Sequence, residues 1–153
     1  MSKMHMIVVG LDGSEASAKA LRFALEEARS HGAEVKAVKA WNVPPLAYGA
    51  AWSVPIDPDD YAKIAQTELD KSLADAGAAN SGVTVTPVLR EGQPAHILCA
   101  EARGADLLVV GSRGLGGFRG LLLGSVSQQC ANHAPCPVVI IPHDRAEAAE
   151  EPQ

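Results

Sequence analysis

Small residues at fixed spacing are the strongest candidates for binding chemistry in this chain. Gly111, Gly114, Gly124 and Ser125 form the pattern G-x2-G-x9-G-S. Glycines let the backbone approach a ligand closely, and a helix is expected to begin at Ser125. The N–H groups and dipole at a helix start attract anions, and the hydroxyls of Ser125 and Ser127 add hydrogen-bond donors. The pattern therefore indicates a phosphate site that needs no lysine.

A second loop carries residues suited to the same place in a fold. Gly10, Leu11, Asp12, Gly13 and Ser14 directly follow a short apolar run near the N-terminus. In open α/β sheets, ligands lie beyond the carboxyl ends of the strands, where the strand order reverses. If the strand order is 3-2-1-4-5, this loop and the loop after Gly111 face each other across that point.

Short apolar runs alternate with segments of helical periodicity along the chain. Strands are expected over residues 6–10, 35–41, 83–89, 106–111 and 137–142. Helices are expected from about Ser14 to Gly32, and over residues 61–76, 95–102 and 125–133. This β-α alternation predicts an α/β fold with a parallel sheet covered by helices on both faces. Pro87 places the third strand at a sheet edge, because proline cannot donate to a ladder.

Length and composition bound the functions that are open to the chain. Its 153 residues fit one domain, expected over residues 1–143, followed by an acidic, flexible tail at 144–153. A net charge of -5 weighs against nucleic-acid binding. The N-terminus has no signal-peptide pattern, and no apolar run is long enough to span a membrane. We therefore expect a cytoplasmic protein.

Three cysteines are present, Cys99, Cys130 and Cys136, and no CxxC motif occurs. An odd number of cysteines favours free thiols in a reducing compartment. Each is interpreted as a small, buried apolar residue.

The G-x2-G-x9-G-[S/T] pattern resembles the signature of ATP-binding universal stress proteins. The opening from Ile7 to Ser14 and the strands before and after the signature resemble that family too, so the resemblance covers about residues 4–142. It implies a three-layer α/β/α, Rossmann-like fold with a five-stranded parallel sheet in the order 3-2-1-4-5. It also implies ATP (or AMP or ADP) at the switch point, with Mg²⁺ or Mn²⁺ on the phosphates.

The resemblance also implies roles for individual residues. Asp12 is expected near the ribose or the metal, and the backbone of Ala40 near the adenine. Arg113 falls at a variable position of the signature, within reach of the ligand. The full set of expected contacts is Gly10, Leu11, Asp12, Ala40, Gly111, Arg113, Gly114, Gly124, Ser125, Val126 and Ser127.

The function that follows is a nucleotide-gated regulatory module in a stress response. The family resemblance implies a homodimer formed through the last strand, Val138–Ile141. One alternative is a slow ATPase or autokinase, for which Asp12 is the only plausible catalytic group near the site and Arg113 or Arg119 a source of positive charge. Another is a family member that keeps the fold without retaining ATP. No dedicated catalytic set is visible in the sequence.

Simpler interpretations of the same residues stay open. Ser125 and Gln128 match a capping box, S-x-x-Q, which needs no ligand. A capping role for Asp12 in the first helix and a turn-forming role for the glycines are further alternatives that need no ligand. GxxxxGK[ST], GxSxG and HExxH motifs are absent, and the near match to GxGxxG at Gly114 has arginine at its last position.

Four of the six aromatic residues fall within residues 41–61: Trp41, Tyr48, Trp52 and Tyr61. This loop leaves the second strand at the same end of the sheet as the expected site. We predict that it forms a lid or wall over the nucleotide, and packing against the sheet or a partner subunit is the alternative.

Overall fold

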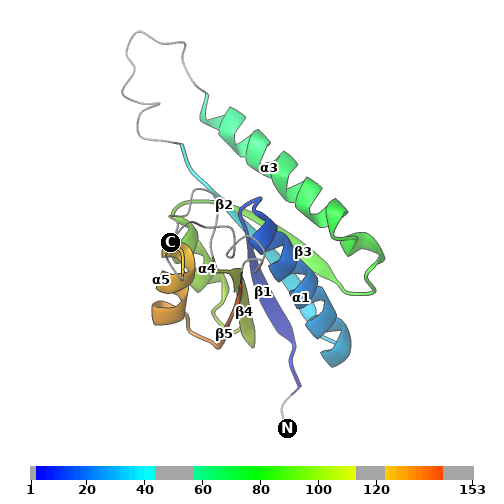
Figure 1. Cartoon of the computed structure of the whole chain (residues 1–153). Helices are drawn as coiled ribbons and strands as arrows, with labels where there is room; N and C mark the ends of the chain where they lie inside the picture. The colour runs from blue at the N-terminus through cyan, green and yellow to red at the C-terminus, as the bar shows by residue number, and fades with distance from the viewer. Residues whose placement is uncertain (1–2, 44–56, 113–122, 143–153) are drawn as a thin grey trace, which may run out of the picture.

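A parallel five-stranded sheet forms the centre of the molecule, in the order β3-β2-β1-β4-β5 (Figure 1). The computed structural model describes residues 3–43, 57–112 and 123–142. All four strand pairings are parallel, which confirms the expected fold class and strand order. The strands are β1 Met6–Leu11, β2 Glu34–Trp41, β3 Val85–Glu91, β4 Leu107–Gly111 and β5 Val138–Ile141.

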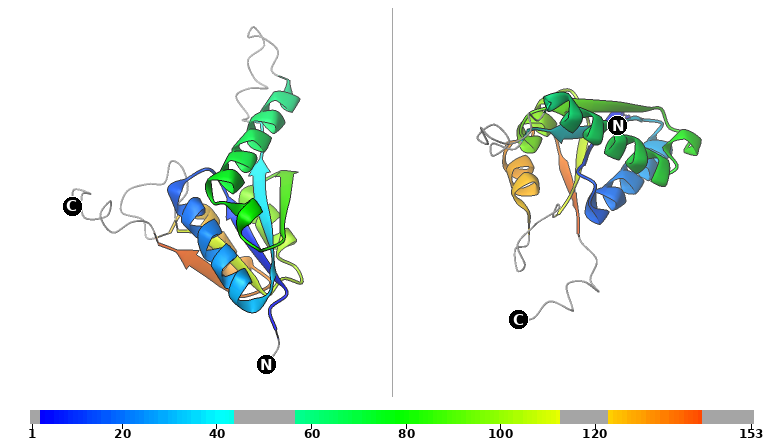
Figure 2. Two further views of the ribbon diagram at one scale, coloured as in Figure 1. Left: turned by 90° about the vertical axis from the view of Figure 1, so that its right-hand side faces the viewer. Right: turned by 90° about the horizontal axis from the view of Figure 1, so that it is seen from above.

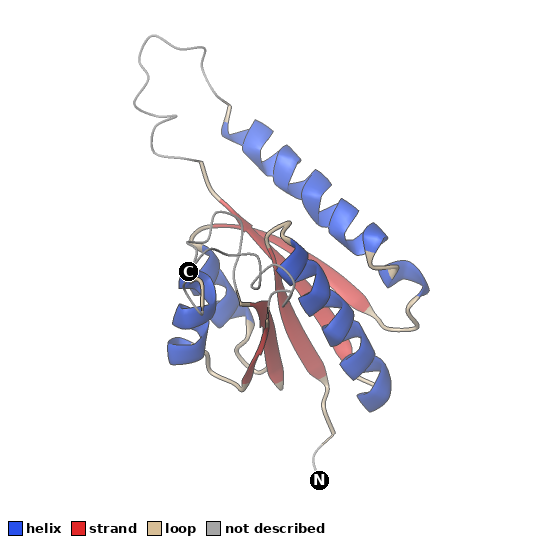
Figure 3. Ribbon diagram, viewed as in Figure 1, coloured by secondary structure: helices blue, strands red, loops and turns tan. Residues whose placement is uncertain are grey.

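Helices cover both faces of the sheet and complete three layers. Figure 3 shows the red strands between α1 on one side and α4 and α5 on the other. The view from above in Figure 2 shows the same layers. The first turns of α3 extend beyond the end of β2 (Figure 2). The helices are α1 Glu15–His31, α3 Pro58–Asp75, α4 Pro94–Glu101 and α5 Ser125–His133, with a short 3-10 helix, η1, at Ala78–Asn80.

Each face of the sheet has its own apolar core. The face under α1 and α3 is built around Ile7, Val9 and Leu69, all without exposed surface. The face under α4 and α5 is built around Val8 and Leu108. Since β1 and β4 contribute alternate residues to both cores, they read as nearly continuous apolar runs, as expected for central parallel strands.

Local signals explain where α1 begins and ends. Ser14 is the N-cap, and its side chain accepts a hydrogen bond from the N–H of Ser17 at 3.1 Å. Gly32 ends the helix in the left-handed region at φ 68°, where a residue with a Cβ would be strained. The predicted start and stop of this helix are therefore confirmed.

The third strand lies two residues further along the chain than predicted. It was expected over 83–89 and runs over Val85–Glu91. The turn after η1 continues through Val83, whose N–H donates to the hydroxyl of Ser81 at 3.2 Å. The predicted edge position is confirmed, since β3 pairs only with β2 among the described strands.

Within the described residues, no helix is both long and apolar enough to cross a bilayer. The expected tail at 144–153 lies outside the described residues and stays a prediction.

Candidate functional site

The switch point of the sheet lies between β1 and β4. These strands are parallel neighbours, with Ile7 opposite Leu107 and Val9 opposite Val109. The chain leaves β1 for α1 on one face and leaves β4 for α5 on the opposite face. Connections that diverge in this way open a crevice at the carboxyl edge of a sheet. The turn after Leu11 and the described residue that follows Gly111, Ser112, therefore lie at this same edge.

The turn after β1 holds Asp12 in an exposed position. Oδ1 of Asp12 accepts a hydrogen bond from the N–H of Ser14 at 2.9 Å and a second from its hydroxyl. The N–H of Asp12 donates to Oγ of Ser17 at 3.4 Å. Gly13 between them adopts φ 84°. Because Ser14 caps α1, the interpretation of Asp12 as the helix cap is wrong, and the carboxylate instead orders the turn at the crevice.

Gly111 ends β4 where the first turn of α1 crosses the sheet. A Cβ at this position would lie 2.7 Å from Cβ of Ala16 and 2.9 Å from its carbonyl carbon. Real Cβ atoms do not approach backbone so closely, so glycine is required by helix–strand packing alone. The first glycine of the signature therefore has a structural reason that is independent of any ligand.

Ser112, directly after β4, is hydrogen-bonded to β5 and to the start of α5. Its N–H donates to the carbonyl of Ile141 in β5 at 2.7 Å. Its own carbonyl accepts the N–H of Gly124 at 2.6 Å and the hydroxyl of Ser127 at 2.7 Å. Ser112 and Gly124 therefore lie next to each other in space. Arg113 and Gly114 lie outside the described residues.

The hydrogen bonds that join Ser112 to Gly124 and Ser127 were not predicted from the sequence. Ser112 occupies a position between two signature glycines and acts through its backbone, so its side-chain type carried no signal. Ser127 was expected to bind phosphate through its hydroxyl, yet it is buried and that hydroxyl donates to Ser112. A hydroxyl has one proton to donate, and here the backbone carbonyls of Ser112 and Gly124 are its acceptors, so it is not available to a phosphate.

The first turn of α5 presents N–H groups without a side-chain cap. Gly124 is the N-cap and makes no side-chain cap bond. Its carbonyl accepts the N–H of Gln128 at 3.0 Å, so the helix begins at Ser125. The predicted capping box from Ser125 to Gln128 is therefore wrong, because Ser125 lies inside the helix instead of before it. The exposed Ser125 and the half-buried Val126 stand at the helix start, where anions are favoured.

Ala40 lies just beyond the level at which β1 stops pairing with β2. The β1–β2 register ends at Leu11 opposite Lys39, so the backbone of Ala40 on that side extends past its neighbour. The other side of Ala40 pairs with Arg90 in β3. The position is compatible with the predicted backbone contact to a ligand in the crevice.

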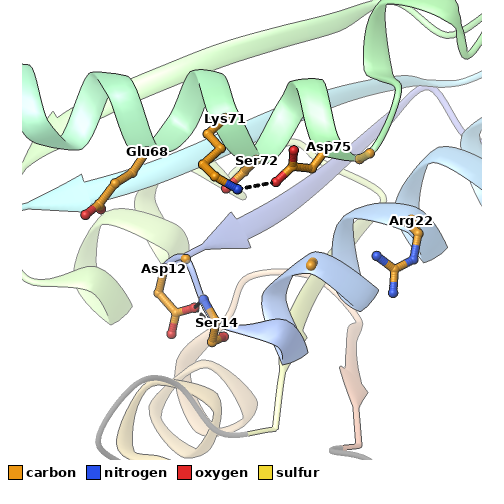
Figure 4. Close-up of a pocket in the computed structure, with 10 residues that line it drawn as sticks. Asp12, Ser14, Arg22, Glu68, Lys71, Ser72 and Asp75 are labelled. Carbon is orange, nitrogen blue, oxygen red and sulfur yellow. Dashed lines mark hydrogen bonds and ion pairs between the residues drawn. The ribbon is translucent and has the colours of Figure 1, made fainter.

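A groove of about 270 Å³ lies between α1 and α3, with the Asp12 turn at one end of it. Figure 4 shows Asp12 and Ser14 on one wall and residues of α3 on the other. Lys71 pairs with Asp75 at 2.7 Å within it. None of the signature glycines lines this groove, so it is separate from the predicted site and meets it only at the Asp12 turn. The lining residues are Asp12, Gly13, Ser14, Ala18, Arg22, Glu68, Lys71, Ser72, Asp75 and Ala76.

The predicted metal position at Asp12 has one carboxylate and no preformed cage. In the three described stretches of chain, no group of three or more His, Cys, Asp or Glu side chains is placed to hold a metal ion.

Trp41 and Tyr61 of the aromatic loop are half-buried. Tyr48 and Trp52 lie outside the described residues, so the predicted lid stays a prediction.

Comparison with known proteins places this architecture in a family. Residues 4–142 match the universal stress protein family. A universal stress protein of Mycolicibacterium smegmatis is 35% identical over 139 residues, which cover 88% of this chain and 45% of the relative. This chain thus spans about half the length of that relative. Universal stress protein YxiE of Bacillus subtilis is 31% identical over 145 residues, which cover 90% of this chain and 98% of YxiE.

Solved structures agree with the sequence comparison. A universal stress protein solved in complex with cAMP is 29% identical, with a TM-score of 0.66. The match covers 92% of this chain and 98% of that one. Fold, strand order and family match extend over the same region, and the chain therefore belongs to the universal stress protein family.

Proposed function

We propose that this chain binds an adenine nucleotide in the crevice between the Asp12 turn and the first turn of α5. The observation that carries the proposal is the bond from Gly124 to Ser112. It fixes the uncapped start of α5 beside the end of β4, and β4 is the direct neighbour of β1. An uncapped helix start and an exposed carboxylate thus flank one switch point, the arrangement that suits a phosphate and a ribose.

Each residue takes a part in this arrangement that matches its position. The N–H groups of Ser125, Val126 and Ser127 face the phosphates, and the Ser125 hydroxyl adds a further donor. Asp12 accepts hydrogen bonds from ribose hydroxyls, and the backbone of Ala40 meets the adenine. The remaining wall is formed by Gly10, Leu11, Gly111 and Gly124, with Arg113 and Gly114 contributed by the segment outside the described residues.

The relative solved with cAMP supports an adenine nucleotide as the ligand class. We propose ATP as the ligand in the cell, with AMP and ADP as weaker alternatives, because α5 offers several N–H groups for more than one phosphate. Mg²⁺ or Mn²⁺ fits as a companion of the nucleotide. Mg²⁺ in proteins commonly binds one or two carboxylates together with phosphate oxygens and water, and Asp12 supplies one exposed carboxylate.

The site is tested by placing a negative charge at the start of α5. Ser125→Glu sets a carboxylate against the phosphates, at a Coulomb cost of roughly 1–4 kcal/mol near 4 Å. We expect calorimetric ATP affinity to fall at least about fivefold. An acidic residue in the first turn favours the helix dipole, so folding is retained.

Gln129→Glu is the matched control, since it adds the same charge one turn further along α5 at an exposed position. We expect it to bind ATP with little change. Equal losses in both variants would point to a general charge effect, and unchanged affinity in Ser125→Glu would exclude the proposed phosphate position.

We further propose that the protein is a nucleotide-gated regulatory dimer in a stress response. Phosphoryl transfer needs a base or water-orienting group together with strong charge stabilisation. Among the described residues assigned to the crevice, Asp12 is the only carboxylate. A slow ATPase or autokinase is therefore the second candidate, and it rests on the exposed position of Asp12.

Turnover separates these candidates. Saturable ADP release that is lost in Asp12→Asn, with ATP binding retained, would establish the enzyme. If the purified protein carries no nucleotide and binds none in calorimetry, the chain is a family member that keeps the fold without binding ATP. The three free thiols support the expectation of a reducing, cytoplasmic setting.

A further inference from the structure

Three thiols from three elements meet on the α4–α5 face of the sheet. Cys99 lies in α4, Cys130 in α5, and Cys136 two residues before the start of β5. Cys130 has no exposed surface and belongs to the core of this face, and the half-buried Cys99 and Cys136 pack against the same core. All three are free cysteines.

Cys99 and Cys130 are neighbours across the two helices. Both side chains pack in the core of this face, and α4 and α5 pack against each other. A disulfide requires the two sulfur atoms to approach to about 2.05 Å. Since both thiols lie in one core between two packed helices, the bond needs a local shift of α4 and α5 and no unfolding.

The two thiols differ in access. Burial raises the pKa of Cys130 to about 12, with a further rise from the neighbouring Cys99. Burial also raises the pKa of Cys136. A buried, protonated thiol is inert toward oxidants in solution, whereas Cys99 is half-exposed. An oxidant therefore meets Cys99 first, with Cys130 waiting behind it.

We propose that Cys99 and Cys130 are a thiol pair that forms an intramolecular disulfide when the protein meets a hydroperoxide. The Cys99 sulfur attacks the O–O bond, becomes a sulfenic acid and releases water or an alcohol. The Cys130 sulfur then attacks the Cys99 sulfur, the S–S bond forms, and the hydroxyl leaves as water with the Cys130 proton. Two thiols are oxidised and one peroxide is reduced. A dithiol reductant reverses the change.

The bond would also reach the proposed nucleotide site. α5 carries Cys130 near its centre and the proposed phosphate contacts in its first turn, so tying α5 to α4 moves those N–H groups relative to Asp12. This consequence rests on the proposed function, while formation of the disulfide does not. We expect the oxidised protein to bind ATP at least about threefold more weakly, and reduction to restore binding.

The test uses the full chain treated with hydrogen peroxide, then alkylated in denaturant and digested without reduction. Trypsin leaves Cys99 on residues 91–103 and both Cys130 and Cys136 on residues 120–145. The variant Cys136→Ser therefore identifies the partner. We expect the linked peptides in both wild type and Cys136→Ser, and their absence in Cys99→Ser and Cys130→Ala.

A link that disappears in Cys136→Ser would overturn the pairing, as would cross-links between chains. Accumulation of Cys99 sulfinic acid with no link would overturn it as well. Because Cys130→Ala alters a core position, its far-ultraviolet circular dichroism is compared with wild type, and the wild-type peptide map decides the matter if that variant is unfolded. A disulfide with unchanged ATP affinity would overturn the coupling, and failure of even the reduced protein to bind ATP would count against the proposed function alone.

Discussion

At the scale of single residues, two glycines near the switch point make room for different neighbours. A Cβ on Gly111 would lie 2.9 Å from the carbonyl carbon of Ala16, which is backbone of α1. A Cβ on Gly10 would lie 2.7 Å from Cδ1 of Leu98, the end of a flexible side chain. The first obstacle can move only with the helix, whereas the second can rotate away.

We expect Gly111→Ala to destabilise the fold more than Gly10→Ala. Overpacking a rigid core costs about 1–3 kcal/mol, and Gly111→Ala should fall at the upper end because the clash is with backbone. Urea unfolding of both variants measures the difference. Equal losses in the free energy of unfolding would show that α1 shifts freely on β4. The ATP affinity of Gly111→Ala would then show whether the glycine is needed for binding instead of for packing.

The serines near α5 show how far residue types predict a site. Ser125 and Ser127 both follow Gly124 in a pattern typical of phosphate binding, and the sequence cannot distinguish them. Their roles diverge because α5 turns Ser127 into the core, where its hydroxyl meets the carbonyl of Ser112, the residue directly after β4. This meeting depends on tertiary packing, which spacing along the chain does not encode.

At the scale of elements, Asp106 fastens the start of β1 to the start of β4. Its Oδ2 accepts the N–H groups of His5 at 2.7 Å and Met6 at 3.0 Å. The hydrogen bond from His5 and then that from Met6 hold the pKa of this carboxyl below its usual value. A carboxyl with a lowered pKa stabilises the fold above its unfolded pKa of about 3.9 and loses that contribution as the pH falls toward the folded pKa.

Asp106→Asn should therefore be less stable than wild type at pH 7, and the two proteins should converge below about pH 4. Denaturant unfolding between pH 3 and pH 7 measures this difference. Asp70→Asn, on the exposed face of α3, is the control and should show little effect. A difference that stays constant with pH would assign the loss to packing instead of charge.

A second link between elements joins β2 to α3. Lys39 is only 7% exposed in its side chain and pairs with Glu68 at 2.9 Å, whereas the Lys71–Asp75 pair is 75% and 63% exposed. An exposed pair contributes at most about 1 kcal/mol, and breaking a fully buried pair costs about 3–5 kcal/mol. Glu68 is half-exposed, so its loss falls between these limits.

Glu68→Gln should lower the free energy of unfolding by roughly 1–2 kcal/mol, because it leaves Lys39 without its carboxylate. Asp75→Asn is the matched control and should cost less than about 1 kcal/mol. Thermal and urea unfolding compare the two. An equal, small loss in both would mean that water reaches Lys39 as readily as it reaches Lys71.

The periodicity of the sequence predicted these elements well, and their ends less well. β1 and β4 were evident because they are buried on both faces and therefore apolar throughout. The start of β3 was misplaced because Val83 and Thr84 have strand-like side chains, while Ser81 bonds the N–H of Val83 in a turn. A single side-chain hydrogen bond thus overrode strand propensity at that end.

At the scale of the whole molecule, the sheet has two edges with different protection. The outer edge of β3 contains Pro87, which removes one donor. The outer edge of β5 belongs to a strand of four half-buried residues, Val138–Ile141. Unpaired strand edges favour pairing with another chain. This contrast supports the proposal that a homodimer forms through β5 instead of β3.

The β5 ladder identifies the backbone groups that such a dimer would use. The N–H of Leu108 donates to the carbonyl of Pro137, and that of Ser112 to the carbonyl of Ile141. Leu108 is the register partner of Val138, so the N–H and carbonyl of Val138 point away from β4 toward the outer edge. Proline at this position would remove an outward donor without breaking the β4–β5 ladder.

Val138→Pro should therefore weaken the dimer while the subunit stays folded. Val138→Ala is the matched control, since it shortens the side chain and keeps the N–H. Sedimentation velocity at micromolar concentration, with and without ATP, measures both variants and wild type. If ATP gates the dimer, linkage requires that dimerisation and ATP affinity change together. If ATP strengthens the wild-type dimer, Val138→Pro should bind ATP more weakly than wild type. If ATP weakens the dimer, Val138→Pro should bind ATP more tightly. A Val138→Pro protein that dimerises like Val138→Ala would contradict pairing through β5, and a wild-type dimer insensitive to ATP would contradict the gating.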